Sequence, residues 1–203
     1  MLGLPRSTEV NRRVAKEKLY ANAPLTPQVR SMIRDQIESV IWRNKLADST
    51  IGINAGEVVI EIQVFEIRLR QRELDKRILL AIAKAIPYKI LFIITFGEEA
   101  QAWMEAAGTF YHTPWVPLEG LTLKFQGLNL DAVYENLVRQ IADGRLGTEG
   151  NIADAVERDR RRQKLERDIA ALEKKMLRER QFNRQVELSS KVKRLIKELE
   201  GLQ

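Results

Sequence analysis

The sequence predicts an α/β protein, a compact domain with a mixed sheet that is followed by a long C-terminal, coiled-coil-like helical arm. Two observations carry this prediction. The centre of the chain alternates between stretches with strand and helix patterns, and no Pro or Gly occurs between Asn151 and Leu199. We therefore expect an α/β domain over residues 1–144, a Gly-containing linker over 145–154 and a basic helical arm over 155–203.

The first elements have helical patterns. A short helix is expected over residues 10–20, after an extended start. A longer helix is expected over 26–46, because Thr26 can cap it, Pro27 suits its first turn and apolar residues recur every three or four positions up to Leu46.

A strand, a helix and a second strand follow in immediate succession. The stretch GEVVIEIQVFEIRLR alternates between two faces, RELDKRILLAIAKAIP has helical spacing and ends at Pro87, and YKILFIITF is a continuous apolar run. This order predicts a right-handed parallel crossover. Gly97 then turns the chain into AQAWMEAAG, the expected hairpin partner, so the sheet should be mixed.

The remainder of the domain is predicted to be a loop and one helix. Residues 114–127 contain two Pro and two Gly, which exclude a helix there and favour a loop with a short strand. The stretch LDAVYENLVRQIAD has helical spacing and ends before Gly144.

The arm carries two apolar stripes that differ in phase. Their members repeat as in coiled coils, and we expect them to bind a partner: Leu165, Ile169, Leu172 and Met176 in the first, and Leu188, Val192, Leu195 and Leu199 in the second. The 12 residues from Met176 to Leu188 break the repeat, which predicts a bend in one long helix. An isolated helix is marginal in water, so the arm needs a second copy, another protein or the chain's own domain.

The net charge of +6 lies entirely in the C-terminal quarter. Residues 155–203 contain 15 Lys and Arg against 9 Asp and Glu, and the rest of the chain has 19 of each sign. The candidate contacts to nucleic-acid phosphates are Arg160, Arg161, Arg162, Lys164 and Arg167. A solvated helix with ion pairs such as Glu157 with Arg161 explains the same residues without a ligand.

Composition limits the compartment and the chemistry. The chain has no Cys, which excludes disulfides, thiolate zinc sites and a Cys nucleophile. The N-terminal stretch lacks the pattern of a secretory signal, and no apolar run is long enough for a membrane span. We therefore expect a cytoplasmic protein without membrane contact. The Gly spacings of phosphate-binding loops are missing as well.

His112 is the only His of the chain and lies in the aromatic stretch FYHTPW. Neither a second His nor a Cys is available to build a transition-metal site, and no G-x-S-x-G motif supplies a nucleophile. We expect His112 to have a packing or hydrogen-bonding role.

Three carboxylates are candidates for a catalytic site, which would make the protein a nuclease. Glu38 lies on the expected long helix, and Glu57 and Glu61 lie on the expected long strand, an order similar to that of restriction-type nucleases, which hold Mg²⁺ with acidic ligands. Gln63 stands where such enzymes use Lys, and acidic residues on an exposed strand face explain the pattern equally well. Mg²⁺ is expected only under this alternative, and no other cofactor or metal is expected.

Six segments together resemble one bacterial family in their order and spacing. They are LGLPRSTEVNRRVAKEKLY (2–20), DQIESVIWRNKLADSTIGI (35–53), EIQVFEIRLRQRELD (61–75), AIPYKILFIITF (85–96), YHTPWVPLEGLTLKFQGLNLDAVYENLVRQIA (111–142) and RERQFNRQVEL (178–188). The chain is similar to the family of domains of unknown function numbered 4391 over nearly its full length. The resemblance implies a bacterial protein whose relatives are encoded near helicase and DNA-methyltransferase genes of restriction or phage-defence character. It implies no catalytic residues.

The favoured function is therefore that of a non-catalytic accessory or adaptor subunit of a bacterial DNA-processing or phage-defence complex. Its arm would dock onto a helicase or DNA methyltransferase, with the arginines near bound DNA. A degenerate Mg²⁺-dependent restriction-type nuclease and a homodimeric DNA-binding protein are the alternatives.

Overall fold

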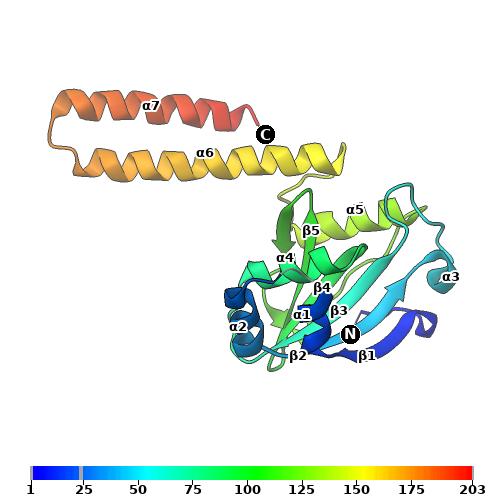
Figure 1. Ribbon diagram of the computed structural model, residues 1–203. Helices are drawn as coiled ribbons and strands as arrows, with labels where there is room; N and C mark the ends of the chain where they lie inside the picture. The colour runs from blue at the N-terminus through cyan, green and yellow to red at the C-terminus, as the bar shows by residue number, and fades with distance from the viewer. Residues whose placement is uncertain (1, 23–24, 203) are drawn as a thin grey trace. The chain divides into compact units, whose positions relative to one another are not determined.

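The computed structural model describes residues 2–22 and 25–202 and divides into two compact units, Met1–Gly144 and Arg145–Gln203 (Figure 1). The helices of the first unit are η1 (Arg6–Thr8), α1 (Lys16–Asn22), α2 (Pro27–Gln36), α3 (Asp48–Ile51), α4 (Lys76–Ala85), η2 (Leu118–Gly120) and α5 (Leu130–Ile141). Its strands are β1 (Glu9–Val14), β2 (Ile37–Leu46), β3 (Ile62–Leu69), β4 (Lys89–Phe96), β5 (Glu99–Ala106), β6 (Thr109–His112) and β7 (Val116–Pro117).

Within the described residues, these strands form one mixed sheet in the order β1-β2-β3-β4-β5-β6, with β7 paired to β5. β3 and β4 are parallel and are connected through α4, whereas every other neighbouring pair is antiparallel. The expected strand–helix–strand crossover and the hairpin that follows it are therefore confirmed.

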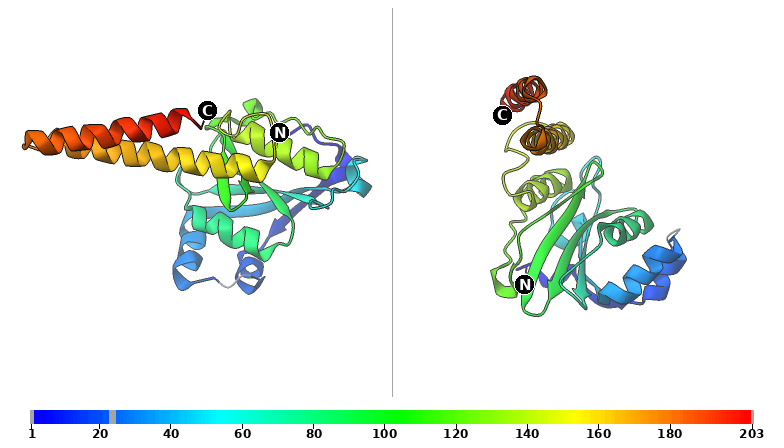
Figure 2. Two further views of the ribbon diagram at one scale, coloured as in Figure 1. Left: turned by 90° about the horizontal axis from the view of Figure 1, so that it is seen from above. Right: turned by 90° about the vertical axis from the view of Figure 1, so that its left-hand side faces the viewer.

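Helices cover both faces of the sheet. Figure 2 shows α1, α2 and α4 on one face and α5 on the other. On the first face, Ile33 of α2 and Ile78 of α4 pack in a buried cluster with Phe65 and Phe92 of the central strands. On the other face, the Tyr134 hydroxyl of α5 donates a 2.9 Å hydrogen bond to the backbone oxygen of Glu105, and burial raises the pKa of Tyr134.

Three expected elements differ from the structure. The helix expected over 26–46 ends at Gln36, and the chain continues as β2, because the run from Ile37 to Trp42 is rich in β-branched and aromatic residues and pairs with both β1 and β3. The helix expected over 10–20 is β1 followed by α1, and the strand expected from Glu57 begins at Ile62. In each case strand pairing decides a pattern that local periodicity leaves ambiguous.

Asp75 caps the N-terminus of α4. Its carboxylate accepts the backbone N–H of Arg77 at 2.9 Å and pairs with the Arg77 guanidinium at 2.7 Å. The Arg77 side chain, and then its backbone N–H, hold the pKa of Asp75 below its usual value. The first turn of α4 therefore depends on an ionised carboxylate.

Replacing Asp75 with Ala should lower the free energy of unfolding of the first unit by about 1 kcal/mol at pH 7. Asp75→Asn keeps a capping oxygen and should lose less. Because the pKa of Asp75 is depressed in the folded state, the ionic contribution is present above the ordinary Asp pKa of about 4 and is lost as the pH falls through the folded value. Urea unfolding followed by Trp fluorescence at pH 7 and pH 3 measures it, since all three Trp lie in this unit. Equal stabilities at pH 7 would contradict the capping role.

The second unit is a helical hairpin. α6 (Ile152–Arg178) and α7 (Phe182–Glu200) lie side by side and run in opposite directions (Figures 1 and 2). The single long helix expected from the absence of Pro and Gly is thus wrong, and α6 begins within the residues expected to be a linker. Instead of a bend, the break in the apolar repeat corresponds to a complete reversal of the chain.

Glu179 organises the turn of the hairpin. Its backbone is extended, and its carboxylate accepts the backbone N–H groups of Arg180 and Gln181 at 2.9 and 3.0 Å. The hydrogen bond from Gln181, and then that from Arg180, lower the pKa of Glu179. The Gln185 side chain also donates to the Glu179 backbone oxygen at 2.6 Å. These hydrogen bonds hold the short extended segment that connects α6 to α7.

Candidate functional site

The apolar stripes of the arm lie in the contact between α6 and α7. Leu165 and Ile169 of α6 and Leu188 and Val192 of α7 are buried, although a separate helix would expose them. The remaining members of the stripes are half-buried: Leu172, Met176, Leu195 and Leu199. A partner role for these eight residues stays a prediction, and it now requires the two helices to separate.

The five basic residues predicted to contact phosphates do not lie on one surface. Arg161 pairs with Glu198 of α7 at 2.7 Å, and Arg162 pairs with the buried Asp159 at 2.5 Å and donates to the Arg145 backbone oxygen at 2.9 Å. Arg161 therefore joins α6 to α7, whereas Arg162 ties the start of α6 to the segment before it. Arg160, Lys164 and Arg167 are exposed and lie three or four residues apart on one side of α6.

Two further basic residues continue this side of α6. Lys174 and Arg178 are exposed. Lys174 follows Arg167 by seven residues and Arg178 follows Lys174 by four, so both fall on the same side of the helix. We call Arg160, Lys164, Arg167, Lys174 and Arg178 the α6 basic stripe. It extends over roughly 27 Å at 1.5 Å per residue. The same spacing rule, applied beyond Arg167, could have found both residues in the sequence.

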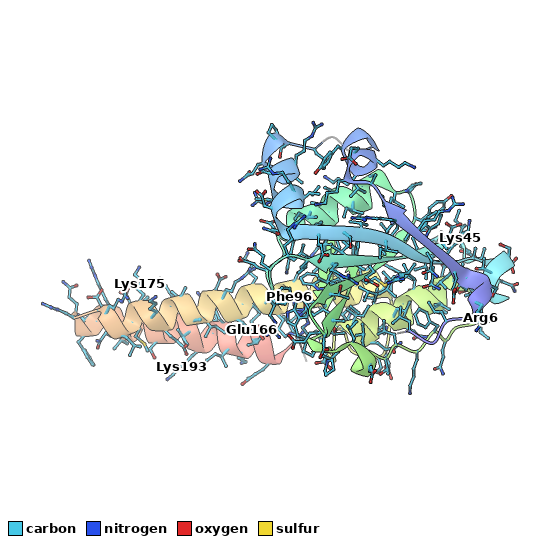
Figure 3. All side chains as sticks on the ribbon, turned by 90° about the horizontal axis from the view of Figure 1, so that it is seen from below. Arg6, Lys45, Phe96, Glu166, Lys175 and Lys193 are labelled. Atoms are coloured by element: carbon cyan, nitrogen blue, oxygen red, sulfur yellow. The ribbon has the colours of Figure 1, made fainter. Side chains whose placement is uncertain are left out.

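The α6 basic stripe lies opposite the apolar stripe. Arg167 is two residues from both Leu165 and Ile169, and Lys174 is two residues from both Leu172 and Met176, a spacing that places side chains on opposite sides of a helix. Acidic residues such as Asp168 and Glu173 flank the stripe without interrupting it. In Figure 3, Lys175 of α6 and Lys193 of α7 project from opposite edges of the hairpin, so basic residues are available on more than one side.

The turn of the hairpin is both basic and apolar. Leu177 and Phe182, on either side of the turn, are 83% and 75% exposed. Residues 172–193 contain seven Lys and Arg against three Asp and Glu. Leu177 and Phe182 thus offer apolar surface to another molecule at the turn.

The three carboxylates of the nuclease alternative are not brought together. Glu38 lies at the start of β2, not on a helix, whereas Lys45 near the end of β2 pairs with Glu61 at 2.7 Å. Glu38 and Glu61 are thus separated by most of the strand length, roughly 23 Å at 3.3 Å per residue. Glu57 has an exposed side chain in the loop before β3, and its backbone N–H donates to Asp131 at 2.7 Å. The three carboxylates are apart because Glu38 lies on a strand and not on the expected helix.

Glu61 forms an ion pair and a hydrogen bond with neighbouring side chains. One carboxylate oxygen pairs with Lys45 and the other accepts a hydrogen bond from the Gln63 amide. The hydrogen bond to Glu61 raises the pKa of Lys45. In the described part of the chain, no three His, Asp or Glu side chains are placed to share a metal ion.

His112 packs as expected from its aromatic surroundings. Its ring stacks on Trp103 with 4.2 Å between the ring centroids, and its Nδ1 lies 2.9 Å from the Thr113 backbone oxygen. Trp103 in turn donates its indole N–H to Gln101 at 3.0 Å. These contacts place His112 in the packing of β5 against β6.

None of the helices in residues 2–22 and 25–202 has the length and apolar character that crossing a bilayer requires.

Comparisons with known proteins identify a family. No curated protein and no solved structure matches the chain. A family model does match, over residues 2–199, which confirms the resemblance seen in the sequence. The chain belongs to the family described as Domain of unknown function (DUF4391).

Proposed function

We propose that the protein is a non-catalytic accessory subunit of a bacterial DNA-processing or defence complex, and that the α6 basic stripe binds the DNA phosphate backbone. The observation that supports this most directly is the arrangement of α6. Its apolar side packs against α7, and its opposite side presents five exposed cations in line.

The geometry of the stripe suits a phosphate backbone. Cations spaced about 5–10 Å apart along a straight helix can each meet a phosphate of a duplex without reading its bases. Each neutralised phosphate releases condensed counterions and makes the affinity dependent on salt. Binding by the stripe alone should therefore be independent of sequence and sensitive to ionic strength.

The complex proposed here also contains a protein partner, a helicase or a DNA methyltransferase. The family resemblance supports the class of partner, and the exposed Leu177 and Phe182 at the turn support a protein contact there. Purification of the complex with and without nuclease treatment distinguishes a direct contact between the two proteins from binding of both to the same DNA molecule. Light scattering on the isolated protein tests the homodimer alternative.

Reversing three charges of the stripe, Lys164→Glu, Arg167→Glu and Lys174→Glu, should abolish binding to a 30-base-pair duplex at about 0.15 M salt. In the wild type, the slope of log K against log[salt] should approach −4.5 if all five cations contact phosphates, at about −0.9 each. The triple variant should lose more than half of that slope. Fluorescence anisotropy over a salt series measures both quantities.

A matched control carries the same change in net charge on the first unit: Arg12→Glu, Lys84→Glu and Lys124→Glu, all at exposed positions. It should retain most of the wild-type affinity. If both triple variants lose affinity equally, the effect comes from net charge and not from the stripe. If the wild type does not bind DNA at low salt, the proposed role of the stripe is wrong.

A further inference from the structure

A pocket of about 420 Å³ lies on the α5 side of the sheet, over β1, β2 and β3. Val64 of β3 and Ile93 of β4 line it together with Leu2 and Leu4 of the N-terminal segment, so part of its wall is apolar. Its volume is within the range of small-molecule sites. None of the residues discussed for DNA binding lies in it.

Two irregularities in neighbouring strands direct polar side chains into this pocket. The register of β1 with β2 shifts between Glu9 and Arg12, and that of β2 with β3 shifts between Trp42 and Asn44. Asn11, in the first shift, has a left-handed backbone with a φ of 48°. Such bulges turn side chains away from the regular alternation and are common beside functional sites.

Arg43, which lies in the second shift, connects Asn11 to the buried carboxylate of Glu66. The Arg43 guanidinium donates to Oδ1 of Asn11 at 3.3 Å and, through Nε and Nη2, to Oε2 of Glu66 at 2.7 and 2.6 Å. Glu66 is only 2% exposed in the middle of β3. Its charge is thus balanced by Arg43, and also by Arg68 at 3.6 Å.

One oxygen of this carboxylate remains without a hydrogen bond. Within the described residues, Oε1 of Glu66 is approached only by Arg68, at a distance longer than a hydrogen bond. Among the described residues, the fully buried side-chain atoms without a hydrogen bond are Oε1 of Gln63 and Oγ1 of Thr95. Oε1 of Glu66 therefore opens into the pocket, where it can accept a hydrogen bond from a ligand.

The neighbouring polar groups also offer acceptors. Asn44 lies opposite Val64, on the same face as Glu66. Its amide nitrogen donates to the Thr8 hydroxyl oxygen at 2.8 Å, which leaves Oδ1 to accept. Arg43 directs three of its five N–H donors at Glu66 and Asn11. The pocket therefore offers acceptors to a ligand that donates hydrogen bonds.

We propose that this pocket binds a nucleobase that carries an exocyclic amino group. An amino group can donate one hydrogen to Oε1 of Glu66 and the other to Oδ1 of Asn44, and the flat ring can pack on Val64 and Ile93. A neutral donor fits better than a cation because Arg43 and Arg68 already balance the charge of Glu66. The base can belong to a free nucleotide or to an unpaired position of a strand.

Matched pairs of ligands test this on the unaltered protein. GMP should bind about tenfold more tightly than IMP, which lacks only the amino group, and CMP more tightly than UMP by a similar factor. Amide chemical shifts in ¹⁵N-labelled protein should change at Asn44 and Glu66. Equal binding within each pair, no binding at millimolar concentration, or shifts confined to other residues would each overturn the proposal.

Two variants locate the site. Glu66→Gln turns an acceptor into an amide that can place a donor in the pocket, so the preference for the amino group should disappear. Asn11→Gly accepts the left-handed backbone and should stay folded, but it removes the bond that holds Arg43 and should weaken binding severalfold. Unchanged GMP binding in a folded Asn11→Gly protein would contradict the assigned site.

A single-stranded oligonucleotide distinguishes the two sources of the base. If an oligonucleotide with one G in a T tract binds more tightly than GMP in a protein with the α6 stripe reversed, the pocket takes a base from a strand. If GMP binds as well as the oligonucleotide, the ligand is a free nucleotide. Both results are obtained with the reversed stripe, so they are independent of whether the stripe binds DNA.

Discussion

Replacing Val192 with Asp should melt the helical hairpin and leave the α/β unit folded. Val192 is 7% exposed between α7 and α6. Losing its burial costs about 1.5–3 kcal/mol, and an unpaired buried carboxylate adds several kcal/mol more. A hairpin of two helices has little stability to lose. Far-UV circular dichroism should lose the signal of the 27-residue α6 and the 19-residue α7, while Trp fluorescence, which reports on the first unit, stays unchanged.

The same helix offers a matched control. Val186→Asp makes the identical change at a position that is 49% exposed, and it should leave the helical signal unchanged. A Val192→Asp protein with full helical content, or equal losses in both variants, would mean that the apolar stripes do not hold the hairpin together. The comparison also shows that substitutions in these stripes cannot separate partner docking from folding of the arm.

The arm illustrates what periodicity determines and what it leaves open. Both apolar stripes and the break between Met176 and Leu188 are visible in the sequence, and both stripes are buried or half-buried as their spacing indicates. A phase break is compatible with either a bend or a reversal of the chain. The choice depends on whether the two stripes cover each other, which is a contact between segments and not a local property.

The sheet shows the same limit in another form. The crossover from β3 through α4 to β4 was predictable, because its alternating, helical and continuous apolar patterns are each distinct. β2 was not, since the apolar residues from Val29 to Ile41 fit a helix as well as a helix followed by a strand. Its strand conformation comes from pairing on both sides, with β1 and β3.

The candidate sites were predictable to different degrees. Arg160, Lys164 and Arg167 were found from charge alone, but the ion pair of Arg161 with Glu198 could not be, because it joins two helices that the sequence does not place side by side. No pattern in the sequence indicates the pocket around Glu66. It depends on register shifts in two strands, and strand pairing must be known before a residue can be recognised as irregular.

Replacing Arg43 with Leu should destabilise the first unit by roughly 3 kcal/mol. Glu66 would then remain nearly buried with only the distant Arg68 to balance its charge. Arg68→Leu is the control, because Arg68 is half exposed and lies 3.6 Å from the carboxylate, so its removal should cost less than about 1 kcal/mol. Urea unfolding followed by Trp fluorescence gives each free energy.

The double variant Arg43→Leu with Glu66→Leu shows whether the charge pair or the apolar packing around it stabilises the sheet. Removing both charges places two Leu beside Val64 and Ile93 and leaves no unpaired carboxylate, so the double variant should be more stable than Arg43→Leu alone. If the two losses simply add, the pair is not coupled and Glu66 is stabilised by something other than Arg43. If the double variant equals or exceeds the wild type, the pair contributes nothing to folding. A buried charge kept at such a position is then best explained by binding, which is the role that the pocket assigns to Glu66.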